Sequence, residues 1–318
     1  MHYAIGRNET LQAKVQRITL PPGQRVICIS DIHGRLDLLK ALLRKVQYTP
    51  RDALVLVGDL YTKGPDGQAT LQAIRALAQS PGVYVLRGNC DWAEPYLSEA
   101  ERAWLEGLPH ILDAGAFVCV HGGLASEDLD AHEEWACMKN DAFLEQGLCF
   151  DRYVIAGHWP TGNYTHEIAC NNPIVCHEQR IVAIDGGTVI RRSGQLNAFI
   201  MQDGAFSFEA VDSLPTLRIE RAQTARGGTL NVTWNDRFLT LLEEMGTLAS
   251  YRHERTNIEL TVPQDCVWQD EQGRLCAGHG VTDYWLGVMP GDTVSVVADY
   301  DDRMLVKRDG IEGWLSKP

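Results

Sequence analysis

Six residues whose side chains bind divalent metals follow short apolar runs at five places in the first half of the chain. They are Asp31 and His33, then Asp59, Asn89, His121 and His158. Carboxylate, amide and imidazole donors in one group suit divalent ions such as manganese, iron, zinc or magnesium. Buried carboxylates need a paired positive charge, so these residues would be a costly way to build a core. The residue types therefore predict a metal centre.

Each of these positions comes shortly after a segment whose pattern predicts a buried strand. The segments are 26–29, 53–57, 83–86, 116–120 and 153–156. Apolar residues at helical spacing predict helices over 36–46 and 71–78, and Ser98 with Glu101 forms a capping box for a third helix. Short buried strands that alternate with helices are typical of an α/β sheet. Because ligands gather at the carboxyl ends of such strands, we expect the six side chains to face one crevice.

Each of these residues also has a commoner explanation when it is taken alone. A single histidine after a strand is more often a core or surface residue than a ligand. Aspartate after glycine is typical of an ordinary turn. That alternative requires five such coincidences in order along the chain, so the pattern favours the metal centre.

Five motifs resemble the calcineurin-like metallophosphoesterase superfamily. They read SDIHG at 30–34, GDLYTKGPD at 58–66, RGNCD at 87–91, VHGGL at 120–124 and AGH at 156–158. The second and fourth motifs are most similar to the bacterial serine/threonine phosphoprotein phosphatase branch. The resemblance covers the first two thirds of the chain and implies an α/β (α+β) two-sheet sandwich with two divalent metal ions.

The resemblance also implies a ligand set. One metal would be bound by Asp31, His33 and Asp59, and the other by Asp59, Asn89, His121 and His158. Asp59 would then bridge the two ions. Two such ions can share a hydroxide, lower its pKa and hold the phosphoryl oxygens while that hydroxide attacks phosphorus.

Two lysines are candidates for holding the phosphate, because negative charge stays on its oxygens throughout the reaction. Lys63 stands where the family usually has an arginine. It is expected to act with Asp59 and Asn89 in catalysis, and with Asn89 in substrate binding. Lys139 is a candidate for the family's second phosphate-binding arginine. For both lysines, a solvated surface position is the alternative.

The chain departs from the phosphatase branch at two linked positions. Cys90 stands where that branch has the histidine of GNHE or GNHD, its presumed general acid. Thr62 stands where the branch has the carboxylate partner of that histidine. The whole acid pair is therefore missing. The sequence GNCD at 88–91 also occurs in the phosphodiesterase-like branch of the superfamily.

These observations lead to one favoured function and two alternatives. We expect a dinuclear-metal-dependent phosphoesterase, favouring a phosphomonoesterase of serine/threonine protein phosphatase type that acts on a phosphorylated protein or a small phosphoester. The first alternative is a phosphodiesterase or dinucleotide polyphosphate hydrolase with the same centre. The second alternative is a non-catalytic metal-binding scaffold with a C-terminal binding barrel.

The pattern of the chain changes in its last third. Short strands separated by glycine-containing turns begin after Asn171, and a boundary near Val211 predicts a catalytic domain over 1–211 and a smaller all-β domain over 212–318. About the last sixty residues resemble a bacterial Src homology 3-like barrel. Such a barrel would bind a peptide or another ligand, or would only pack against the catalytic domain.

Composition excludes several classes of protein. Hydrophobic residues make up 45% and charged residues 22% of 318 residues, which is typical of a folded globular chain. The net charge of −13 and the lack of a basic run argue against nucleic-acid binding, and no apolar run is long enough to span a membrane. Nine scattered cysteines without a CxxC motif, and charged residues such as Arg7 and Glu9 in place of a secretory signal, favour a cytoplasmic protein with reduced thiols.

Overall fold

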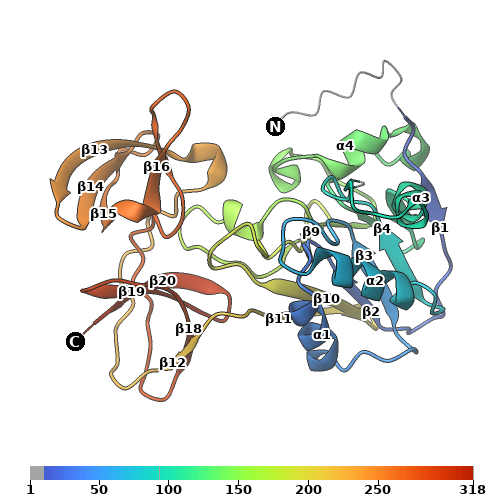
Figure 1. The fold of residues 1–318 in the computed structure, drawn as a ribbon, viewed down its shortest axis with the longest axis horizontal. Helices are drawn as coiled ribbons and strands as arrows, with labels where there is room; N and C mark the ends of the chain where they lie inside the picture. The colour runs from blue at the N-terminus through green and yellow to red at the C-terminus, as the bar shows by residue number, and fades with distance from the viewer. Residues whose placement is uncertain (1–10, 93, 318) are drawn as a thin grey trace. The chain divides into compact units, whose positions relative to one another are not determined.

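A computed structural model describes residues 11–92 and 94–317 of the chain (Figure 1). Two compact units are present. The first contains the described residues up to Trp159 together with 173–185 and 196–211, and the second contains 160–172, 186–195 and the residues from Asp212 onward. Arg7 and Glu9 lie outside the described residues.

Two mixed sheets form the first unit. One sheet has the strand order β1-β5-β6-β7-β9-β8, and its strands are Val15–Arg17, Ile111–Asp113, Phe117–Val120, Tyr153–Ala156, Ile181–Ala183 and Ile174–Cys176. The other has the order β11-β10-β2-β3-β4, and its strands are Ala205–Val211, Leu196–Gln202, Val26–Ile29, Ala53–Val57 and Val83–Leu86. Neighbouring strands β2, β3 and β4 run parallel, as do β6 and β7.

Side chains that alternate along the central strands connect the layers of this unit. Cys28 and Val55 contribute to a core shared with Cys119 and Ile155 of the other sheet. The intervening residues, such as Ile27, contribute to a second core that includes helix residues. Because both faces of these strands are covered, they read as continuous apolar runs rather than as alternating ones. The predicted two-sheet sandwich is confirmed.

Helices α1 (Leu36–Lys45) and α2 (Gly67–Leu77) contribute their apolar faces to this second core (Figure 1). Helix α3 (Glu99–Gly107) begins with the predicted capping box, in which Ser98 accepts from the Glu101 amide and Glu101 accepts from the Ser98 amide. Helix α4 (Glu134–Met138) is short. Single 3₁₀ turns occur at Leu129–Ala131, Phe143–Glu145, Thr161–Asn163, Trp234–Asp236 and Gln264–Cys266.

Two antiparallel sheets form the second unit. The four-stranded sheet has the order β12-β18-β19-β20, with strands Thr216–Arg218, Thr293–Asp299, Arg303–Arg308 and Ile311–Ser316. The five-stranded sheet has the order β15-β14-β13-β17-β16, with strands Glu259–Pro263, Leu248–His253, Phe238–Met245, Leu275–Ala277 and Val267–Gln269. The β-rich character of the last third is confirmed, and its resemblance to a Src homology 3-like barrel stays a prediction.

Two segments from the middle of the chain pack within the second unit. The Asn171 amide donates to the Gly310 carbonyl (2.9 Å), and the Glu312 amide donates to the Ala169 carbonyl (3.0 Å). The buried Lys307 ammonium donates to the Ser193 carbonyl (2.7 Å). The predicted boundary near Val211 would put both segments, 160–172 and 186–195, in the catalytic domain. The division into domains 1–211 and 212–318 stays a prediction.

All nine cysteines are free thiols. None of the helices in the described part of the chain is long and apolar enough to cross a membrane.

Candidate metal centre

The six predicted ligands follow the carboxyl ends of β2, β3, β4, β6 and β7. Backbone hydrogen bonds hold neighbouring loops together at this edge. The Asp31 amide donates to the Gly58 carbonyl (3.0 Å), and the His33 amide donates to the Asp59 carbonyl (2.9 Å). In the other sheet, the Gly157 amide donates to the His121 carbonyl (2.9 Å). Hydrogen bonds between backbone groups therefore connect the loops that carry the predicted ligands.

Backbone strain is concentrated in these loops. The φ angles of Asp31, His33, Asp59 and His158 are 55°, 47°, 53° and 65°, and that of Lys63 is 72°. Residues with a Cβ avoid this left-handed region, and such conformations persist where the surrounding structure enforces them, often at functional sites. The strain therefore marks the same edge of the fold as the metal-ligand types do.

Two glycines let these loops approach each other closely. Gly58 has a φ of 81°, and a Cβ there would lie 2.7 Å from the Gly88 amide nitrogen. A Cβ on Gly88 would lie 2.3 Å from Asp59 Oδ1. The first contact would push the two loops apart and the second would displace the Asp59 carboxylate, so side chains are excluded at both positions.

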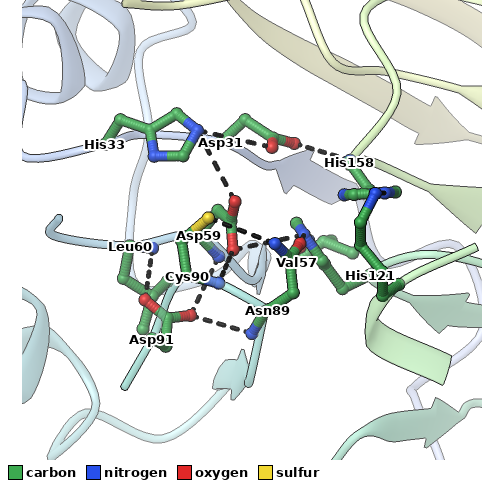
Figure 2. A network of polar contacts seen from close by, with 12 residues as sticks. Asp31, His33, Val57, Asp59, Leu60, Asn89, Cys90, Asp91, His121 and His158 are labelled. Atoms are coloured by element: carbon green, nitrogen blue, oxygen red, sulfur yellow. Dashed lines mark hydrogen bonds and ion pairs between the residues drawn. The ribbon is translucent and has the colours of Figure 1, made fainter. Parts of the chain in front are cut away.

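Asp59 lies at the middle of the candidate centre (Figure 2). Its carboxylate is 2% exposed, with Oδ2 3.5 Å from His33 Nε2 and Oδ1 3.3 Å from His121 Nε2. The two oxygens thus face two different predicted ligands. This geometry supports the proposal that Asp59 bridges two ions.

Asp31 is also buried, at 1% exposure. Its Oδ1 lies 3.8 Å from His33 Nε2, and its Oδ2 accepts from the His158 amide (3.0 Å). Donor atoms of Asp31, Asp59 and His121, which the resemblance assigns to two ions that share Asp59, all lie within 4.8 Å of one another. Buried carboxylates this close repel each other unless a cation lies between them. The residues therefore fit a divalent metal centre.

The tautomer of His121 suits a metal ligand. Its Nδ1 donates to the Val57 carbonyl (2.8 Å), which leaves Nε2 facing Asp59 and Asn89 Oδ1 (3.1 Å). Burial works against a charge on this ring, but the charges of Asp59 and Asp31 prevail and raise the pKa of His121 to about 10. In the metal-free protein a proton thus supplies positive charge here, and metal binding would displace it.

His158 is brought to the same centre, with its ring centroid 5.4 Å from that of His121. Its Nε2 lies 2.7 Å from Asp141 Oδ1 and 3.3 Å from Lys139 Nζ, so Nδ1 is the nitrogen left for a metal. Burial, with the nearby His121 charge, lowers the pKa of His158 to about 4, so the ring is neutral near pH 7, as a metal ligand must be.

The two predicted phosphate-binding lysines lie at different sides of this set of ligands. Lys63 is exposed and hydrogen-bonds to the Cys90 thiol. Its ammonium group is partly buried, which works against the charge, but that hydrogen bond and the charges of Asp59 and Asp31 raise the pKa of Lys63. Lys139 directly follows α4 and forms an ion pair with Asp141 beside His158. The roles of both lysines in binding phosphate stay predictions.

Thr62 and Cys90, at the positions of the family's acid pair, are bonded to other groups. The Thr62 hydroxyl donates to the Cys90 backbone carbonyl (2.8 Å) instead of orienting a side chain. Burial raises the pKa of the Cys90 thiol, which accepts from the Asn89 amide group (3.2 Å). A neutral buried thiol is a poor proton donor, so a leaving group receives little help from this position.

Asp91 was not predicted as a residue of the site. Its carboxylate accepts hydrogen bonds from backbone amides of the loops that carry the ligands (Figure 2). One oxygen accepts from the Asp59 amide (2.9 Å) and the Gly88 amide (2.8 Å), and the other accepts from the Leu60 amide (2.7 Å). The available signal was the aspartate that ends the RGNCD motif. The position of Asp91 in the motif does not show whether its carboxylate oxygens bind backbone amides or a metal.

Asp91→Ala is expected to weaken metal binding by about 10–100-fold, the usual effect of losing a group that orients a ligand. It also leaves three buried amides without an acceptor, at about 1–3 kcal/mol each. Asp283→Ala is a matched control, because Asp283 accepts from three amides of Gly228, Thr229 and Leu230 in the second unit. Both variants should lower the unfolding temperature, but titration with Mn²⁺ should show weaker binding only for Asp91→Ala. Equal metal affinity in the two variants would contradict this role.

A second group of donors lies in the second unit but does not make a comparable centre. Asp265, Cys266 and His279 have donor atoms within 4.8 Å of one another. The Arg192 guanidinium lies 2.6 Å from His279 Nε2 and 3.7 Å from Asp265 Oδ2. A cation is therefore already present where a metal ion would bind.

Comparisons with known proteins find a family match over the part of the chain that contains the six predicted ligands. The family model described as calcineurin-like phosphoesterase matches residues 24–187, slightly more than half of the chain. The proteins called bis(5'-nucleosyl)-tetraphosphatase, symmetrical, of Pectobacterium atrosepticum and Escherichia coli are each 44% identical over 64 residues, which is 20% of this chain and 22% of theirs. The match thus spans about a fifth of the length of these curated relatives.

Solved structures with a similar fold include a putative diadenosine tetraphosphatase, 23% identical with a TM-score of 0.46, which covers 62% of this chain and 98% of its own. They also include a protein serine/threonine phosphatase of Saccharomyces cerevisiae, 13% identical with a TM-score of 0.44, which covers 64% of this chain and 85% of its own.

Proposed function

We propose that this chain, which belongs to the calcineurin-like phosphoesterase family, hydrolyses a phosphoric anhydride in a dinucleoside polyphosphate. From the sequence alone, a protein phosphatase was the favoured function and this activity was the first alternative. The similarity to symmetrical bis(5'-nucleosyl)-tetraphosphatases supports moving it to first place. In the proposed reaction, one water molecule and one diadenosine tetraphosphate give two molecules of ADP.

The missing acid pair is the observation that carries this proposal. Hydrolysis of a serine phosphate expels an alkoxide, a strong base that must be protonated as it leaves. Hydrolysis of the central anhydride expels a nucleoside diphosphate, a weak base that leaves as an anion. Thr62 donates to a backbone carbonyl and Cys90 is a neutral thiol, so the site suits the second kind of leaving group.

The ligand set explains how the chain would bind and orient such a substrate. When bound, two divalent ions supply a nucleophile at neutral pH and neutralise phosphoryl charge. Asp31 and His33 would hold one ion, His121, Asn89 and His158 would hold the other, and Asp59 would hold both. Lys63 and Lys139 would add positive charge beside the two ends of this group, and a polyphosphate has enough anionic oxygens to reach both.

A panel of three substrates tests the proposal. Purified protein loaded with Mn²⁺ is assayed with diadenosine tetraphosphate, 4-nitrophenyl phosphate and a phosphoserine peptide, and nucleotide products are separated by chromatography. Because general acid catalysis contributes about 10²–10⁴-fold, we expect kcat/KM for diadenosine tetraphosphate to exceed that for phosphoserine by at least about 10²-fold. ADP should be the only nucleotide product. Equal turnover of phosphoserine and diadenosine tetraphosphate, or ATP with AMP as products, would contradict the proposal.

A further inference from the structure

Two tryptophans close in sequence to residues of the metal centre are exposed. Trp92 is 45% exposed and Trp135 is 58% exposed. Indoles of this size are usually buried more completely, and exposed aromatic side chains are common where a ligand binds. Neither indole is used by the chemistry derived above.

Trp92 is attached to the side of the centre that contains Cys90. It directly follows Asp91, which accepts from the Asp59 amide. The hydroxyl of the fully buried Tyr61 donates to the Trp92 carbonyl, and the Trp92 indole N–H donates to Glu94 (2.7 Å). The backbone of Trp92 and the N–H edge of its indole are thus both held by hydrogen bonds, while the residue stays exposed. A preorganised stacking surface requires this combination.

Trp135 is connected to the part of the centre that contains His158. It lies in α4, and its carbonyl accepts from the Lys139 amide (2.8 Å). The ammonium of Lys139 lies 3.3 Å from His158 Nε2. One helical turn therefore connects this exposed indole to the cation that borders the second metal position.

We propose that Trp92 and Trp135 are stacking platforms for the two nucleobases of a dinucleoside polyphosphate whose phosphates lie at the metal centre. This inference rests on the proposed function and names the residues that select its substrate. Such a substrate has an aromatic base at each end and anionic phosphates between them. The proposed site has an exposed indole at each end and a cationic centre between them, so the two match in order. Stacking uses the face of a base and not its edge, so adenine and guanine substrates should be accepted alike.

The test compares ligands that differ only by a nucleoside. Calorimetry measures binding of ADP and of inorganic pyrophosphate to the Mn²⁺-loaded protein, for the native chain and for Trp92→Ala, Trp135→Ala and the double variant. Base stacking changes affinity by about 5–150-fold per base. We expect the native protein to bind ADP more tightly than pyrophosphate by that factor. The advantage should fall toward 1 in the double variant, while pyrophosphate affinity stays unchanged.

Kinetics gives a second readout. Each single variant should raise KM for diadenosine tetraphosphate by about 5–150-fold and leave the affinity for inorganic pyrophosphate within about 2-fold. Phenylalanine at either position should restore most of the lost affinity. Trp234→Ala and Trp268→Ala are matched controls, because these indoles are 49% and 41% exposed in the second unit, and they should change neither measurement.

The outcomes separate this inference from the proposed function. If the native protein binds ADP no more tightly than pyrophosphate, or if the alanine variants keep the full ADP advantage, the stacking role is overturned whichever substrates are hydrolysed. An ADP advantage that depends on both indoles, in a protein that does not cleave diadenosine tetraphosphate, would keep the nucleotide platforms and overturn only the proposed reaction.

Discussion

Asp59→Asn is expected to lower hydrolysis by at least about 10³-fold and to reduce metal content at both positions, with the fold retained. Each carboxylate oxygen of Asp59 faces a different histidine, so one substitution weakens both sites. A bound metal stabilises the transition state by several kcal/mol, and each 1.36 kcal/mol is about tenfold in rate. The amide is nearly the same size as the carboxylate, so loss of charge is the main change.

Metal analysis and activity are measured together to test this expectation, with circular dichroism to check the fold. Asp31→Asn should keep more metal, because Asp31 is predicted to contact only one ion. Asp52→Asn is the matched control: Asp52 is also a buried carboxylate, but it pairs with Arg25 (2.8 Å) away from the centre. It should lower stability without changing metal content. If Asp59→Asn loses one metal only and stays active, the bridging role is wrong.

The first unit could be predicted from the sequence because its strands are short, apolar and buried on both faces. The runs 26–29 and 53–57 correspond to β2 and β3 without a shift. In contrast, β13 reads FLTLLEEM and is exposed over most of its length, so neither a buried run nor strict alternation marks it. Its place in a sheet depends on pairing with β14 and β17, which no local pattern encodes.

The candidate site was predictable for a different reason. Metal ligands are limited to a few residue types, and parallel strands bring their ends to one edge, so Asp31, Asp59 and His121 could be expected together. The roles of Asp91 and Asp141 could not, because a carboxylate that accepts from backbone amides or from a lysine has the same sequence signature as a ligand. The motif set also describes the centre and not the substrate. For that reason the favoured substrate changed once relatives were compared, while the expected ligands did not.

Restoring the missing acid pair gives the second large effect. Cys90→His with Thr62→Asp is expected to raise turnover of a phosphoserine peptide by about 10²–10⁴-fold, the usual contribution of general acid catalysis. The new aspartate would hold the new imidazole in place. Thr62 cannot do so, because its hydroxyl donates to the Cys90 carbonyl. Either change alone should give much less, because an unoriented histidine or an aspartate without its partner cannot donate a proton efficiently.

The pH profile distinguishes this explanation from a general change in the site. The new imidazole must be protonated to donate, so the gain for phosphoserine should be present at low pH and should disappear as the pH rises through the pKa of that histidine. Hydrolysis of diadenosine tetraphosphate should show no such gain, since its leaving group needs no proton. Cys90→Ser with Thr62→Asp is the control, because it introduces a hydroxyl that cannot supply a proton near neutral pH. If the native protein already cleaves phosphoserine as fast as 4-nitrophenyl phosphate, a general acid is present elsewhere. The missing pair would then no longer argue for an anhydride substrate.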